Sequence, residues 1–254
     1  MWISGWLNGS AAADDVLDAL QHWAEQHDVV AADEATADAL EIPERGETPV
    51  PLAALLTRLR QTGTTAARLA LPVPGDVRGL GGRSSFAGLA LHAGEAVVLL
   101  GSPLGLVPEN AADGVILWTV FDLGETPVAD QVPIGEAEHE LSGATRVAAG
   151  VLTELGVAKR RTGVREELER RVAARSGSTW PDAMPPRALR VLQRANEVSA
   201  ILELASEDEP GGAVSSAAAR RRAEALRPLG DAVRTARRAA VDEAVRTLCP
   251  SDQS

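Results

Sequence analysis

A glycine-rich segment in the N-terminal half has the residue types that bind anions. Residues 76–85 read Asp-Val-Arg-Gly-Leu-Gly-Gly-Arg-Ser-Ser and fall between a predicted strand and a predicted helix. Glycines let backbone N–H groups approach an anion, and a helix N-terminus adds positive potential. Two arginines, Arg78 and Arg83, could hold a phosphate or carboxylate between them. The predicted ligand-binding residues are Arg78, Gly81, Gly82, Arg83, Ser84 and Ser85.

Neither standard nucleotide-binding signature is present in this segment. The dinucleotide pattern Gly-x-Gly-x-x-Gly fails because Ser84 stands where the third glycine is needed after Gly79 and Gly81. No Gly-Lys-[Ser/Thr] occurs anywhere in the chain. Two interpretations therefore stay open, a site for an anionic or phosphate-bearing ligand and a flexible surface loop whose glycines need positive φ.

The other residues that could bind a metal or act as a nucleophile predict no site. Glu136, His139 and Glu140 share a helical face, and Glu-x-x-His resembles half of a di-iron helix, but the second Glu-x-x-His that such a centre needs is missing. We interpret them as a solvated helix start and expect no metal and no cofactor. Cys249, beside Pro250, is predicted to be an incidental thiol near a frayed end. No catalytic residue is identified.

Arginine-rich helices near the C-terminus are a second candidate for binding. Residues 159–175 carry seven basic and three acidic side chains, and Arg220, Arg227 and Arg234 follow at seven-residue intervals. Phosphate contacts need such arrays of cations. However, residues 151–254 have a net charge of only +3, whereas DNA-binding domains are usually much more basic. We expect either solvated helix faces or a surface complementary to the chain's own acidic N-terminal half, and we favour a protein partner over a nucleic acid.

Composition excludes several classes of protein. The chain has 254 residues, a net charge of −11 and 45% hydrophobic residues, which is ordinary for a folded globular protein. A single cysteine forms no intrachain disulfide, and no run of eighteen apolar residues indicates a membrane span. Met1–Asn8 lacks the basic start of a secretory signal. We therefore expect a cytoplasmic protein without contact to a membrane.

Charge and composition both change along the chain. Residues 1–150 hold 21 acidic and 7 basic residues, while the remainder is slightly basic. Glycine and proline are frequent between residues 43 and 143, and helix-forming Ala, Arg, Glu and Leu dominate after residue 164. These shifts predict two domains, an acidic α/β domain over 1–157 and a helical Arg/Ala-rich region over 158–254 that packs on it or forms a bundle.

Local patterns give the expected elements of an α+β fold. We expect a small mixed sheet of three to five strands, flanked by helices and followed by an all-helical C-terminal region. Apolar β-branched runs predict strands, and the apolar N-terminal stretch predicts a buried strand or loop anchor. The tryptophans are predicted to be core anchors. The strands are expected at 29–32, 66–73, 96–100 and 115–121, the linker at 43–51, the loop at 105–114 and the N-terminal anchor at 2–7.

Helical spacing of apolar residues gives the remaining elements. A stripe at Leu52, Leu55, Leu56 and Leu59 predicts a helix that starts at Pro51. The other helices are expected at about 10–27, 84–94, 134–155, 159–175, 189–206 and 215–248, the last with a kink or break at Pro228 and Gly230.

Three functions remain compatible with the sequence. The leading hypothesis is a non-enzymatic cytosolic protein whose C-terminal helices bind a protein partner or a second copy of the chain. The first alternative is an enzyme or binding module for an anionic or phosphate ligand, centred on residues 75–85. The second is a nucleic-acid-associated regulator that uses the arginine-rich helices.

Overall fold

The computed structural model describes residues 1–154, 164–176, 180–207 and 216–249. The chain forms two compact units. The first contains residues 1–131, 178–184 and 241–254, and the second contains residues 132–177 and 185–240. The boundary predicted at residue 157 lies outside the described residues and remains a prediction.

The first unit is built on a six-stranded mixed sheet. Its spatial order is β2-β1-β6-β5-β4-β3, with β1 and β6 parallel and the other neighbours antiparallel. The α+β class and the helical C-terminal region are confirmed, whereas the predicted count of three to five strands is wrong. The strands are β1 (Gln26–Ala31), β2 (Val50–Pro51), β3 (Ala66–Ala70), β4 (Ala96–Leu100), β5 (Leu104–Ala112) and β6 (Val115–Asp122).

The two strands that sequence patterns missed contain residues that disfavour strands. β2 has two residues, too few to show alternation, and it lies in the segment predicted to be a linker. β5 was predicted to be a loop because Gly105, Pro108 and Asn110 are typical turn residues. It pairs with β6 along its length, but with β4 only at Gly105 and Leu106. Beyond Leu106, β6 is the one described strand that pairs with β5. A proline is tolerated at such an edge position.

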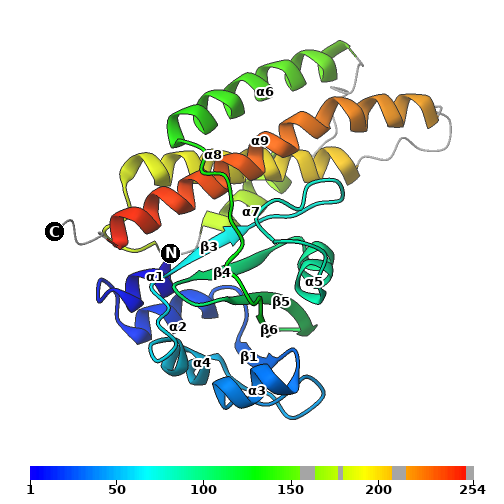
Figure 1. The fold of residues 1–254 in the computed structure, drawn as a ribbon. Helices are drawn as coiled ribbons and strands as arrows, with labels where there is room; N and C mark the ends of the chain where they lie inside the picture. Colours follow the sequence, from blue (N-terminus) through cyan, green and yellow to red (C-terminus); the bar gives the residue numbers. More distant parts are fainter. Residues whose placement is uncertain (155–163, 177–179, 208–215, 250–254) are drawn as a thin grey trace. The chain divides into compact units, whose positions relative to one another are not determined.

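Helices cover both faces of this sheet (Figure 1). α1, α2 and α4 pack on one face, and α5 packs on the other. Their bounds are α1 (Trp2–Leu7), α2 (Ala13–Gln21), α3 (Glu34–Leu40), α4 (Leu52–Leu59) and α5 (Ser85–Ala93).

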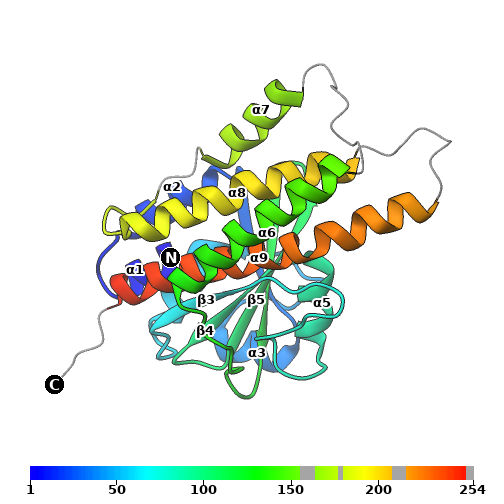
Figure 2. The same ribbon diagram turned by 90° about the horizontal axis from the view of Figure 1, so that it is seen from above.

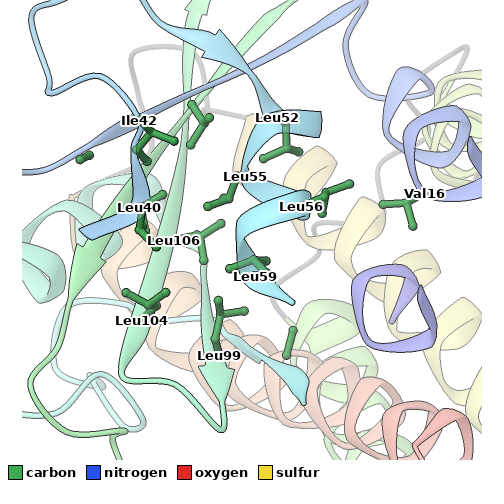
Figure 3. Close-up of a cluster of buried hydrophobic side chains, with 14 of the residues drawn as sticks. Val16, Leu40, Ile42, Leu52, Leu55, Leu56, Leu59, Leu99, Leu104 and Leu106 are labelled. Carbon is green, nitrogen blue, oxygen red and sulfur yellow. The ribbon is translucent and has the colours of Figure 1, made fainter. Parts of the chain in front are cut away.

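The larger core lies under α4, where the predicted leucine stripe is confirmed. All four leucines of the stripe are buried. Leu55 and Leu59 point at Leu99 of β4 and Leu106 of β5 (Figure 3). Fully burying one such side chain stabilises a fold by about 1.5–3 kcal/mol, so this layer fixes α4 on the sheet.

The N-terminal segment is a helix, not the predicted strand or loop anchor. Its large apolar residues fall four apart, as Trp2 with Trp6 and Ile3 with Leu7, which places each pair on one side of a helix. Trp6 is buried, and the Arg60 guanidinium lies 4.2 Å from the centre of its ring. This cation–π contact fastens α1 to the residue after α4.

α2 ends earlier than predicted, and the residue expected at its end belongs to the sheet. The helix stops at Gln21, while His27 lies in β1. Nε2 of His27 lies 2.9 Å from the Leu20 carbonyl oxygen, and Trp118 Nε1 donates to His27 Nδ1 at 3.1 Å. Because an indole N–H only donates, we assign the imidazole proton to Nε2. The histidine therefore joins the last turn of α2 to β6.

α5 is placed by a close contact between an aromatic ring and a glycine. Ser84 caps the helix by accepting a hydrogen bond from the Ala87 N–H at 3.1 Å, which confirms the predicted start. The Phe86 ring lies against Gly105 of β5 and meets Phe121 edge-on, with 5.6 Å between ring centres. A Cβ at position 105 would lie 2.6 Å from Cε2 of Phe86, so the close approach requires glycine.

The second unit is helical (Figure 2). α6 contacts α8, where Arg187 Nη2 donates to Glu138 Oε2 at 2.8 Å, and α7 also packs on α8. Pro228 lies inside α9, so the helix does not break there, and the alternative of a kink remains a prediction. Pro228 and Glu224 are both exposed, and water can reach the carbonyl that the proline leaves unpaired. The helices are α6 (Ile134–Glu154), α7 (Val164–Ser176), α8 (Pro186–Glu207) and α9 (Ser216–Leu248), of which residues 241–248 belong to the first unit.

The Gly105→Ala substitution is expected to lower the free energy of unfolding by about 1–3 kcal/mol, because the new methyl group overlaps the Phe86 ring. Urea unfolding measures the change. Gly88→Ala is the matched control, since a Cβ on this α5 glycine meets no atom within 4 Å and should be neutral or stabilising. Combining Gly105→Ala with Phe86→Leu should cost less than the sum of the two single changes. Simple additivity would contradict the contact.

Candidate functional site

Five of the six predicted ligand-binding residues line one cleft in the first unit. Residues 81–85 form one wall, residues 122–128 form the opposite wall, and Leu80 and Phe86 complete the lining. The cleft has a volume of ≈ 520 Å³. Sequence analysis identified the first wall from its glycines and arginines. The second wall was missed because residues 122–128 contain no arginine and only one glycine.

Arg78, the sixth predicted residue, does not line the cleft. Its guanidinium makes two parallel hydrogen bonds to Asp76, from Nε to Oδ1 and from Nη2 to Oδ2, both at 2.8 Å. A bidentate pair of this kind already supplies the arginine with a carboxylate. The expectation that Arg78 and Arg83 hold one anion between them therefore depends on Arg83.

Arg68 joins the second wall of the cleft to Gly79, which directly precedes the lining of the first wall. From β3 its Nη2 donates to the carbonyl oxygen of Pro127 at 2.6 Å and to that of Gly79 at 3.3 Å. The backbones also approach closely, since a Cβ at Gly81 would lie 3.4 Å from Cγ of Pro127. Gly79 and Gly81 have φ of +82° and +78°, which side-chain-bearing residues rarely adopt. One arginine and two glycines thus set the distance between the walls.

The two walls carry opposite charges. Arg83 is exposed on the first wall, and Asp122 and Glu125 are exposed on the second. Asp122 Oδ1 accepts a hydrogen bond from the Gly124 N–H at 2.8 Å, which orients its carboxylate. Among the described residues, no ion pair connects Arg83 with either acid. The cleft therefore presents a cation facing two anions.

The first unit also has an apolar groove of ≈ 290 Å³ between α1, α2, β3 and the end of α9. Its walls include Trp2, Ile3, Leu20, Trp23, Leu69 and Val241, and Arg68 is the charged residue of the lining. Trp23 was predicted to be a core anchor, but 56% of its surface is exposed, so that prediction is wrong for this residue. It follows the last turn of α2, where the chain turns towards β1.

The remaining candidates stand apart from both cavities. Glu136, His139 and Glu140 are exposed on α6, and no group of three or more His, Cys, Asp or Glu in the described ranges is arranged to hold a metal ion. Cys249 directly follows α9, where Asn8 Nδ2 donates to its Sγ at 2.9 Å. Burial raises the pKa of the Cys249 thiol. Within the described residues, every helix is too short or too polar to span a bilayer.

Comparison with known sequences gives two matching family domains. Residues 1–132 match the family described as Rv1486c-like protein, N-terminal domain, and residues 135–238 match Rv1486c-like protein, C-terminal domain. The chain belongs to the Rv1486c-like family. The change from one family domain to the next falls beside the end of the first unit's main segment at residue 131.

Relatives in the Rv1486c-like family cover nearly the whole chain. "Uncharacterized protein Rv1486c" of Mycobacterium tuberculosis is 37% identical, over 98% of this chain and 96% of its own length. "Uncharacterized protein ML1804" of Mycobacterium leprae is 33% identical, over 98% of this chain and 97% of its own length. No solved structure matches the chain. The relatives thus match the sequence of both units in one polypeptide.

Arg68→Met is expected to lower the free energy of unfolding by about 3 kcal/mol, because two carbonyls lose a charged hydrogen-bond donor worth roughly 1.5–3 kcal/mol each. Chemical denaturation measures the loss. Arg78→Met removes a largely exposed ion pair and serves as the control, with an expected cost below about 1 kcal/mol. Equal losses in the two variants would show that Arg68 does not join the walls.

Cys249 is expected to react slowly with iodoacetamide in the folded protein. Its raised pKa keeps less of the thiol in the reactive thiolate form at neutral pH, and the dependence of the rate on pH should move to higher pH. The same chain unfolded in urea is the control. A folded thiol that reacts as fast as the unfolded one would contradict the buried environment.

Proposed function

We propose that this protein is a non-enzymatic cytosolic interaction protein that binds an apolar and basic segment of a partner protein. The observation that carries the proposal is the groove beside Trp23. Exposed apolar surface with concave shape marks interaction sites on soluble proteins. Tryptophan is also the residue type most enriched among the side chains that dominate binding energy.

The groove supplies the apolar part of the contact. Leu20 and Trp23 come from α2 and its end, Trp2 and Ile3 from α1, and Leu69 from the edge strand β3. His22 meets Trp23 edge-on, with 5.5 Å between ring centres, which limits the orientations of the indole. An amphipathic helix can place its apolar side chains on such a surface.

Charge around the groove favours a basic partner. The exposed face of α2 carries Asp14, Asp15 and Asp18. The first unit as a whole holds 22 acidic and 7 basic residues, counted over its full segments. Such a field attracts basic segments during diffusional encounter and disfavours acidic ones. We therefore assign the groove to a partner segment with apolar residues on one side and Lys or Arg beside them.

The C-terminal helical region takes part in this proposal. Val241 of α9 contributes to the groove, so the region predicted to make protein contacts supplies one of its walls. The single cysteine, which cannot form an intrachain disulfide, is compatible with the reducing cytosol. Self-association through the same helices remains the alternative form of the interaction hypothesis.

A ligand-binding module is the second candidate function. It is favoured by one observation, the cleft formed by residues 80–86 and 122–128. Its size falls in the range of small-molecule sites, which is about 300–1,000 Å³. This candidate does not depend on the groove, because the two cavities share no lining residue.

The Trp23→Ala substitution is expected to weaken binding of a fluorescent Leu/Arg amphipathic peptide by about 30-fold, as is usual for a central tryptophan worth about 2 kcal/mol. Fluorescence anisotropy measures the affinity. Val147→Ala removes an exposed apolar side chain outside both cavities and is the matched control. Replacing Asp14, Asp15 and Asp18 with Asn should lower affinity and its dependence on salt.

Three outcomes would overturn this assignment. Unchanged peptide affinity in Trp23→Ala would remove the groove from the contact. Equal affinity for a Leu/Glu peptide of the same length would remove the preference for basic partners. Sedimentation that shows self-association, abolished by Trp23→Ala, would replace the partner protein with a second copy of the chain.

A further inference from the structure

We propose that the cleft between residues 80–86 and 122–128 binds a small zwitterion of amino-acid or dipeptide size. This inference does not rest on the groove beside Trp23. It starts from the arrangement of charge in the cleft, where Arg83 is on one wall and Asp122 and Glu125 are on the other. A ligand that carries both an ammonium and a carboxylate group satisfies both walls at once.

The opposite charges stay available because the walls are held apart. Arg68 binds the backbone at Gly79, directly before the first wall, and at Pro127 in the second wall. The Asp122 carboxylate is oriented by the Gly124 N–H, and Thr126 Oγ1 donates to the Ser102 carbonyl at 3.3 Å. Within the described chain, Arg83 forms no ion pair across the cleft. A bound zwitterion would supply the missing partner on each side.

Val128 provides exposed apolar surface in the same cleft for the ligand's side chain. Leu80 and Phe86 are buried in the smaller core, while Pro127 and Val128 line the cleft from the second wall. Val128 is 92% exposed, the largest exposed fraction among the large hydrophobic residues that are described. A ligand that covers it removes apolar surface from water, which favours binding. The cleft therefore suits an amino acid or dipeptide with an aliphatic side chain.

A simple anion fits this charge pattern poorly. Two carboxylates repel an anion that approaches Arg83, and Arg78, the second predicted cation, is already paired with Asp76. Charged side chains contribute most to binding affinity when each end of the ligand lies near a residue of opposite charge. In the zwitterion hypothesis, Arg83 binds the carboxylate of the ligand. Asp122 and Glu125, which the sequence pattern did not identify, bind its ammonium group.

Calorimetric titration of the full chain with four probes tests the assignment. Glycyl-L-leucine carries both charges, N-acetylglycyl-L-leucine only the negative one, and glycyl-L-leucinamide only the positive one; inorganic phosphate is the fourth probe. We expect the zwitterion to bind at least about tenfold more tightly than each of the others, a difference that one lost charged contact produces. Free L-leucine should bind better than its amide for the same reason.

Substitutions on the two walls should weaken different sets of ligands. Arg83→Met should weaken glycyl-L-leucine and leave glycyl-L-leucinamide unchanged, since the amide makes no use of the arginine. Asp122→Asn combined with Glu125→Gln should weaken both ligands that carry an ammonium group. Arg78→Met, outside the cleft, is the control and should bind like the wild type. Circular dichroism checks that each variant is folded.

The alternatives give different results. Acetylated dipeptide or phosphate that binds as tightly as the zwitterion would make the cleft an anion site and overturn the proposal. Absence of heat with both glycyl-L-leucine and L-leucine up to about 10 mM, above the millimolar affinities of weak sites, would also overturn it. Trp23→Ala should leave these titrations unchanged, so failure here and failure of the peptide experiment are distinguishable.

Discussion

The packing of Phe86 on Gly105 is the contact on which the first unit's cleft depends. The ring fills the space that a Cβ at position 105 would occupy, and it also meets Phe121 on the neighbouring strand. Because Phe86 is the second residue of α5, this contact fixes the beginning of the helix on the sheet. Ser84 and Arg83 directly precede α5, so the first wall of the cleft takes its position from a glycine in a central strand.

β3 connects the structure of the cleft with the structure of the groove. Arg68 sends its guanidinium to the carbonyls of Gly79 and Pro127 beside the cleft, and both Arg68 and its neighbour Leu69 line the groove. One short strand therefore contributes residues to the surroundings of both cavities. The cleft is charged on both walls and the groove is apolar with acidic residues nearby. The two cavities therefore suit different classes of ligand.

Local sequence patterns predicted much of the fold. The leucine stripe of α4, the strand at 96–100 and the Ser84 and Gly94 ends of α5 are all confirmed. These features depend on residues close together in the chain. Local patterns did not predict β2, because two residues are too few to show alternation. They did not predict β5, because its residues disfavour the strand conformation that pairing imposes. For the cleft, they identified the wall that contains glycines and arginines.

The sequence by itself determined the amphipathic helices, the strongest strands, the acidic character of the first unit and one wall of the cleft, because each follows from neighbouring residues. Only the tertiary structure decided that Arg78 binds Asp76, that Arg68 binds Pro127 and that Trp23 is exposed. Arg68 and Pro127 are 59 residues apart. Contacts of this kind depend on how strands pair and helices pack. Local spacing of residue types therefore does not predict them.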